Sequence, residues 1–233
     1  MESSKRKNQL NKYFWIFLIT GIALQFVAYF LPLISSTKTM PEGTTTTWLS
    51  LVSGIFGIWA VVLCSQGNIW FYMFGFIQTV TAGIICWLNG LYSNFGLNIF
   101  YLITEAYGLY IWYHRLQDRS NHVQARFLSR RTLVMITVCV LLLSIAVGWL
   151  MSRYTNDRQP YLDAFTTVPA IVAQLLMILA FSEHWFVWLA IDILQVVLWA
   201  RAGDWCMTAQ YAFWCINATY GLIHWRRNTL QAS

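Results

Sequence analysis

Charged residues are scarce in this sequence. Aspartate, glutamate, lysine and arginine make up 10% of its 233 residues, while 58% of the residues are hydrophobic. Soluble domains carry about 25% charged residues, because their surfaces need ionic groups that face water. The shortage of charge excludes an ordinary water-soluble domain and indicates a chain that faces lipid.

Sequence motifs of catalysis and metal binding are also missing. The five cysteines form no CxxC pair, and the chain has no HExxH, no P-loop and no GxSxG motif. A retinal protein needs a lysine within a membrane span, and the apolar runs contain no lysine. We therefore predict a protein that is not an enzyme, with no metal site and no cofactor.

The hydrophobic residues gather in long runs. Each run has close to the length, about 20 residues, that a helix needs to cross a hydrocarbon core of about 30 Å. None of the runs alternates with the period of two that is typical of a β-barrel strand. The first run is too long for the core of a signal peptide and no A-x-A site follows it, so we predict a retained span. The sequence predicts an all-α, polytopic membrane protein with about eight transmembrane helices, at 13–33, 48–64, 69–89, 91–113, 132–151, 163–182, 185–201 and 205–225.

Basic residues lie in the short segments between the runs, which is typical of a membrane protein and not of a nucleic-acid-binding face. With eight spans, eleven of the fifteen lysines and arginines fall on the side of both termini, and four fall on the other side. The positive-inside rule then predicts that both termini are cytoplasmic. The four on the outer side are Lys38, Arg153, Arg158 and Arg201.

Two parts of the chain resemble each other. Residues 68–71 (NIWF) and 183–186 (EHWF) each open a span and lie 115 residues apart, whereas Tyr107-Gly108-Leu109 recurs 113 residues later as Tyr220-Gly221-Leu222. The order of the matches indicates a duplication with one small length change between the copies. The predicted parts are a cytoplasmic N-terminus with an extra helix and outer loop (1–47), a three-helix bundle (48–113), a basic loop with a connector helix and outer loop (114–162), a second, parallel three-helix bundle (163–227) and a cytoplasmic tail (228–233).

Polar and aromatic side chains recur at helical spacing within the spans. Trp185, Trp188, Asp192 and Gln195 follow one another at spacings of three or four residues, so they share one helix face. A single amide on such a face also suits a hydrogen bond between helices, and this interpretation stays open. Other spans contribute the remaining candidates for a substrate site, which are Gln78, Asn98, Tyr101, Glu105, Gln210, Trp214 and Asn217.

Asp192 and Glu105 are the most informative of these candidates. A carboxylate at the centre of a span costs about 2.5–3.5 kcal/mol on insertion scales, so we expect both side chains to face the protein interior. No lysine or arginine lies deep in any span to neutralise them. Their expected partner is therefore a proton, a cation or a cationic ligand.

The segment 183–192 (EHWFVWLAID) resembles the WxxWxxx(N/D) signature of the PnuC-type nicotinamide riboside transporters. Residues 74–78 (FGFIQ) and Tyr107-Gly108 with Trp112 resemble the same family, and the resemblance extends over about 48–227. It implies a SWEET-like pair of three-helix bundles, a homotrimer in the bacterial inner membrane, and facilitated diffusion of nicotinamide riboside. A cytoplasmic kinase would then trap this vitamin B3 precursor inside the cell.

The chemistry of the polar faces agrees with that substrate. Nicotinamide riboside joins a flat pyridinium cation to a ribose and carries a carboxamide. Tryptophan faces attract a desolvated cation by up to about 2 kcal/mol, amide side chains match a carboxamide, and a carboxylate balances the charge or accepts ribose hydroxyls. Carboxylates without basic residues repel phosphate, which predicts transport of the riboside and not of its 5′-phosphate.

Three alternatives stay open on the sequence alone. The substrate could be a related vitamin such as thiamine or riboflavin. Transport could be coupled to protons, with Asp192 and Glu105 as the relay. The protein could instead be a membrane receptor or subunit that transports nothing, with its polar faces serving only as contacts between helices.

Overall fold

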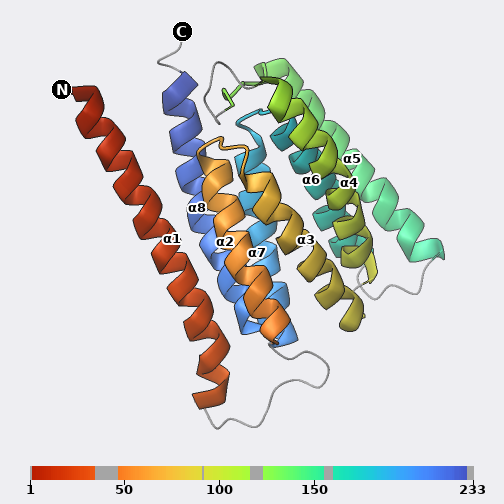
Figure 1. The fold of residues 1–233 in the computed structure, drawn as a ribbon. Coiled ribbons are helices and arrows are strands. Elements are labelled where there is room, and N and C mark those ends of the chain that lie inside the picture. The colour runs from red at the N-terminus through yellow and green to blue at the C-terminus, as the bar shows by residue number, and fades with distance from the viewer. Residues whose placement is uncertain (1, 35–46, 91, 116–122, 155–159, 230–233) are drawn as a thin grey trace.

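The computed structural model describes residues 2–34, 47–90, 92–115, 123–154 and 160–229, and these form eight helices (Figure 1). The predicted all-α class is confirmed. Most of the predicted outer loop within 1–47, the segments 116–122 and 155–159 and the last residues of the tail lie outside the described residues. The helices are α1 (Glu2–Ile34), α2 (Trp48–Ser65), α3 (Phe71–Leu88), α4 (Tyr92–Arg115), α5 (Arg130–Tyr154), α6 (Pro160–Ile178), α7 (His184–Ala202) and α8 (Trp205–Thr229).

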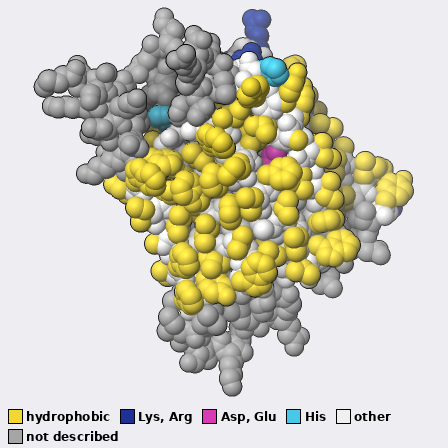
Figure 2. Space-filling view, in the orientation of Figure 1, with side chains coloured by type: hydrophobic (Ala, Val, Ile, Leu, Met, Phe, Trp, Pro, Cys, Tyr) yellow, Lys and Arg dark blue, Asp and Glu magenta, His cyan; other side chains and the backbone are white. Residues whose placement is uncertain are grey.

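The outer surface of the described helices suits lipid. By length and composition, α2, α3, α5 and α7 can each cross a membrane, and Phe14–Phe30 in α1 and Asp163–Ile178 in α6 are shorter apolar stretches. In Figure 2 hydrophobic side chains cover most of the described face, and arginine appears at the end that carries the chain termini. The helices α4 and α8 are less apolar because they carry polar side chains such as Glu105 and Asn217, which are buried inside the protein.

Six of the helices form a closed ring. The helix α2 packs against α3 and α8, α4 packs against α3 and α6, and α7 packs against α6 and α8. The other two helices lie outside the ring, with α1 on α2 and α8, and α5 on α6. The contacts α2–α8 and α4–α6 join the two predicted three-helix bundles to each other, so residues far apart in the sequence surround one interior.

The two halves of the ring repeat with a constant offset of 113 residues. The turn after α2 contains Gly67 with a φ of 68°, and the turn after α6 contains Ala180 with a φ of 59°. The helices α3 and α7 end before Gly90 and Gly203, which have φ values of 70° and 79°. Left-handed residues end helices, so equivalent backbone breaks fall at equivalent places.

The start of this repeat differs from the one predicted from the sequence. Trp70 and Trp185, which lie 115 residues apart, are not equivalent, because Trp70 is 53% exposed and Trp185 is 3% exposed. The buried equivalent of Trp185 is Tyr72, since Tyr72 packs on Gly108 of α4 as Trp185 packs on Gly221 of α8. No length change separates the copies between these residues. The left-handed Ala180 also explains why α6 ends at Ile178 and not at residue 182 as predicted.

One end of the ring, which carries the C-terminus, is closed by two tryptophans. Trp112 of α4 donates its Nε1–H to the carbonyl oxygen of Ile178 at 3.0 Å, and Trp225 of α8 donates to that of Ser65 at 2.9 Å. Both donors and both acceptors are related by the 113-residue offset. Each bond joins the last helix of one bundle to the first helix of the other, and the two ring centroids lie 6.4 Å apart.

The segment 123–128 lies across the same end. The amide of Val123 donates to the carbonyl of Gly67 at 2.9 Å, and the amide of Arg126 donates to the carbonyl of Ala180 at 2.8 Å. The Leu128 amide donates to Glu183 Oε1 at 3.0 Å. The segment therefore ties together the two equivalent turns that follow α2 and α6.

The opposite end is tied by a carboxylate in the turn between α7 and α8. Asp204 accepts a hydrogen bond from the hydroxyl of Ser50 at 2.5 Å and caps α8 by accepting from the Met207 amide at 3.0 Å. Thr47 and Ser50 form the capping box that begins α2. Hydrogen bonds thus join the start of α2 to the start of α8.

Candidate functional site

A cavity of about 140 Å³ lies inside the ring and is lined from all six of its helices. An engineered apolar cavity of about 150 Å³ admits benzene, so the interior has room for a flat six-membered ring. None of the lining residues is lysine, arginine or histidine. The polar and aromatic part of the lining consists of Gln78, Thr79, Asn94, Asn98, Tyr101, Glu105, Thr166, Gln174, Trp185, Trp188, Asp192, Gln195, Trp199, Tyr211 and Trp214, with Phe71.

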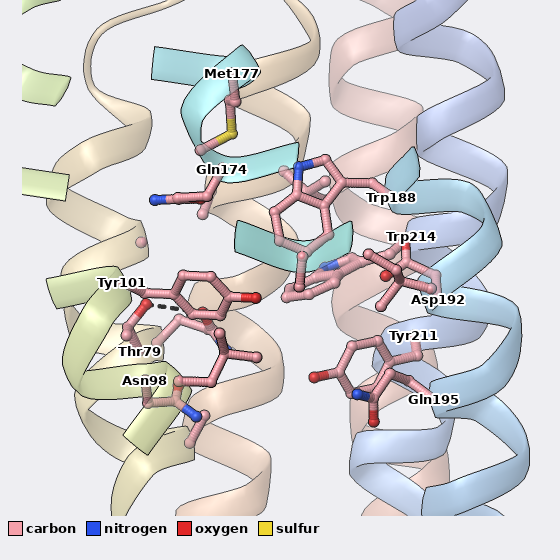
Figure 3. A pocket seen from close by; sticks show the side chains of 18 of the residues that line it. Thr79, Asn98, Tyr101, Gln174, Met177, Trp188, Asp192, Gln195, Tyr211 and Trp214 are labelled. Atoms are coloured by element: carbon pink, nitrogen blue, oxygen red, sulfur yellow. Dashed lines mark hydrogen bonds between the residues drawn. The ribbon is translucent and has the colours of Figure 1, made fainter. Parts of the chain in front are cut away.

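The predicted face of α7 lines this cavity. Trp185, Trp188, Asp192 and Gln195 all belong to the lining, as their spacing of three and four residues predicts. Figure 3 shows Trp188, Asp192 and Gln195 on one side of the cavity, opposite Tyr101. A stripe at this spacing on a helix inside a ring turns its polar groups towards the centre and leaves apolar residues for the outside.

The face of α4 lies opposite. Asn98, Tyr101 and Glu105 line the cavity, and the Tyr101 and Trp188 rings approach each other edge to face, with centroids 6.0 Å apart and an interplanar angle of 61°. Asn98 donates its amide to the carbonyl of Asn94 at 2.8 Å, within its own helix. The cavity therefore presents aromatic edges and faces from two bundles, which a planar group inside it can contact.

The two carboxylates have different surroundings. Glu105 accepts a hydrogen bond on Oε1 from the hydroxyl of Thr79 at 2.9 Å, and the same hydroxyl lies 3.3 Å from Gln78 Oε1. Asp192 is 3% exposed, and its Oδ1 has no hydrogen-bond partner among the described residues. A buried polar oxygen without a donor costs free energy, so Asp192 is suited to a ligand.

Two of the eleven predicted site residues are not part of the lining. Asn217 donates its amide to the carbonyl of Val61 on α2 at 3.0 Å, and the Gln210 side chain packs against Gly57 of α2. Both side chains lie in the contact between α8 and α2, where they stabilise the ring. The interpretation as a hydrogen bond between helices, left open by the sequence, describes Asn217.

The face of α8 that lines the cavity is instead the one next to the predicted face. It consists of Met207, Tyr211, Trp214 and Ala218, which again follow at spacings of four, three and four. Of the predicted α8 residues, Trp214 lines the cavity, and it also donates Nε1–H to the carbonyl of Gly57 at 3.2 Å. The amides Gln210 and Asn217 lie on the neighbouring face of α8, which meets α2.

Five polar residues of the lining were not predicted from the sequence, and they are Thr79, Asn94, Thr166, Gln174 and Tyr211. Thr79 follows the predicted Gln78 directly, and Tyr211 follows Gln210, so both were overlooked beside an amide. Gln174 of α6 donates to the hydroxyl of Thr104 at 3.3 Å. The 113-residue offset could have identified Gln174 from the sequence. It makes Gln174 equivalent to Val61, and Thr104 equivalent to Asn217, and Asn217 bonds to Val61.

Comparisons with known proteins identify the family of this chain. A family model described as "Nicotinamide mononucleotide transporter" matches residues 47–227. The nicotinamide riboside transporter PnuC of Haemophilus influenzae is 30% identical over 190 residues, which cover 79% of this chain and 81% of that protein. The riboflavin/roseoflavin transporter RibM of Streptomyces davaonensis is 24% identical over 157 residues, covering 65% of this chain and 71% of that protein.

A solved structure has the same fold. The crystal structure of the vitamin B3 transporter PnuC is 25% identical in sequence and superposes with a TM-score of 0.80, covering 95% of this chain and 93% of that chain. The superposition includes the ring as well as helices outside it. Since the family model matches well over half of the chain, the protein belongs to the nicotinamide mononucleotide transporter family, that of the PnuC-type vitamin transporters.

Proposed function

We propose that this protein carries nicotinamide riboside across the membrane by facilitated diffusion, holding it in the cavity between the two bundles. The observation that supports this proposal best is the composition of the lining, which combines two carboxylates, several amides and a cluster of aromatic rings with no basic residue. Relatives named for nicotinamide riboside are similar over most of the chain.

Each part of the substrate has a matching group in the cavity. The pyridinium ring can pack against Trp188 and Tyr101, where aromatic faces and edges attract a desolvated cation. Gln195 lies one turn from Asp192, has an unpaired Oε1 and offers the donor and acceptor that a carboxamide needs. Glu105 and Asp192 can accept the ribose hydroxyls or balance the positive charge.

The absence of basic residues from the lining favours binding of the riboside over binding of its 5′-phosphate. The family description names the mononucleotide, whereas the similar PnuC proteins are named for the riboside. A phosphate in this cavity would face Asp192 and Glu105, and like charges placed together cost several kcal/mol. We therefore propose the riboside as the substrate and not the 5′-phosphate.

Calorimetry on the purified protein tests this assignment. We expect nicotinamide riboside to bind, and nicotinamide mononucleotide to bind at least about 100-fold more weakly, which corresponds to about 2.7 kcal/mol. Thiamine and riboflavin serve as comparison ligands, because a relative is named for riboflavin. Tighter binding of either vitamin, or of the mononucleotide, than of the riboside would overturn the assignment.

The orientation and assembly belong to the same proposal. We place the protein in a bacterial inner membrane as a homotrimer surrounded by lipid, with no enzymatic activity of its own. A cytoplasmic kinase that phosphorylates the riboside would maintain the inward gradient. The end of the ring that is closed by Trp112 and Trp225 is then the cytoplasmic end.

A reporter fusion tests the orientation. An enzyme that is active only in the periplasm, fused after residue 227, should show no activity, since the excess of lysine and arginine predicts cytoplasmic termini. The same reporter inserted at residue 40, between α1 and α2, is the matched control and should be active. Activity of the C-terminal fusion would exclude cytoplasmic termini.

A further inference from the structure

The two acids of the cavity are not related by the internal repeat. The residue 113 positions before Asp192 is Thr79, and the residue 113 positions after Glu105 is Ala218. In the first bundle the equivalent positions therefore hold a hydroxyl that donates to a carboxylate, as the 2.9 Å bond from Thr79 to Glu105 shows. In the second bundle they hold a carboxylate and a methyl group, so Asp192 lacks the donor that Glu105 has.

The groups around Asp192 supply no positive charge. Its helix α7 packs on α8, where Tyr211 and Cys215 lie within electrostatic range of the carboxyl, and on α6, whose lining residues carry no titratable group. Tyr101 and Glu105 face it from α4 across the cavity, and Cys86 lines the same cavity from α3. Tyrosine and cysteine are neutral near pH 7, with ordinary pKa values of about 10 and 8.5.

An ionised Asp192 is therefore unfavourable in the empty site. The side chain is 97% removed from solvent, and its Oδ1 has no partner among the described residues. A buried carboxylate without a donor or counter-ion takes up a proton. Glu105 differs in one oxygen, since its Oε1 accepts from the Thr79 hydroxyl, while its Oε2 also has no partner among the described residues.

We propose that Asp192 is a shared site for a proton and for the cationic ring of the substrate. In the empty protein the carboxyl carries the proton. When the pyridinium enters beside Trp188, one helical turn away, the O–H bond of the carboxyl breaks, the proton leaves to solvent, and the carboxylate pairs with the pyridinium. One positive charge replaces another, so the net charge of the site is unchanged. This inference rests on the proposed function, which supplies the cation.

Proton release measured by calorimetry tests the exchange. Nicotinamide riboside binding to the purified protein is recorded at one pH in two buffers that differ in ionisation enthalpy. We expect the heat to depend on the buffer in proportion to about one released proton per site. Because protons compete with the substrate, affinity should rise by about tenfold per pH unit while Asp192 is protonated in the empty protein. The pyridinium charge is permanent, so the ligand does not supply the proton.

Three variants assign the proton to its residue. Asp192→Asn cannot exchange a proton and should bind with no buffer-dependent heat and with pH-independent affinity. Asp192→Glu should restore the release, and Glu105→Gln should retain it, since Glu105, unlike Asp192, has a donor in the Thr79 hydroxyl. Binding of the riboside to the wild type without proton release would overturn the exchange but leave the proposed function intact. Release that persists in Asp192→Asn would also overturn it, and no binding at all would reject both.

Discussion

Replacing Trp188 with alanine should weaken binding of nicotinamide riboside by about 5- to 150-fold. This range corresponds to the loss of about 1–3 kcal/mol when one aromatic ring that stacks on a base is removed. Trp188 lies in the cavity lining one turn from Asp192, and its ring meets that of Tyr101 at 6.0 Å. The equivalent residue of the first bundle, 113 positions earlier, is Gly75, so no second tryptophan occupies that level to compensate.

The dissociation constant and the melting temperature are measured on the same purified variants. Trp149→Ala is the control, because Trp149 of α5 is 52% exposed and lies outside the ring. Trp214→Ala should lower the melting temperature as well as the affinity, since Trp214 donates to Gly57 of α2. Affinity of Trp188→Ala within twofold of the wild type would remove Trp188 from the proposed site.

Much of the fold could be predicted from the sequence because the membrane imposes simple rules. Span length and the spacing of polar residues on α7 depend only on neighbouring positions in the chain. One face of α7 carries Trp185, Trp188, Asp192 and Gln195, as their spacing predicts, and all four residues line the cavity. Their position in a common interior follows from one helix and its periodicity.

The face of α8 could not be found in this way. Its amides Gln210 and Asn217 meet α2, and Met207 and Ala218, which are not polar, line the cavity. Which of two adjacent faces of α8 is turned inward depends on the α2–α8 contact that closes the ring, and this contact joins residues that lie 156 to 160 positions apart. Polarity alone cannot distinguish an amide that binds a ligand from one that binds a neighbouring helix.

The repeat offset shows a second limit of the sequence. Pairing the identical residues Trp70 and Trp185 gives an offset of 115 residues. Burial and backbone conformation instead give an offset of 113 residues. Aromatic residues are 17% of the chain, so chance matches are frequent. The equivalent of Trp185 is Tyr72, which has a different side chain and the same packing on a glycine of the last helix of its bundle.

Loosening the closed end of the ring should expose the cavity. Trp112 and Trp225 are each less than 4% exposed, and each donates to the first helix of the opposite bundle. The double variant Trp112→Phe/Trp225→Phe retains two aromatic rings and loses both hydrogen bonds. Each bond contributes about 0.5–1.5 kcal/mol, so the closed state should lose about 1–3 kcal/mol in total. The population open at this end should then rise by about 5- to 150-fold.

The native Cys64 reports this opening, since it lines the cavity and is 4% exposed. In a chain whose other four cysteines are replaced by alanine, a membrane-impermeant maleimide is applied to vesicles that present the C-terminus outward. The rate of labelling follows the open population, so it should rise by the same about 5- to 150-fold factor. Trp70→Phe is the matched control, because Trp70 lies in the turn after α2 at the same end and is 53% exposed. A double variant that is labelled within twofold of the wild-type rate would show that the two hydrogen bonds do not hold this end closed.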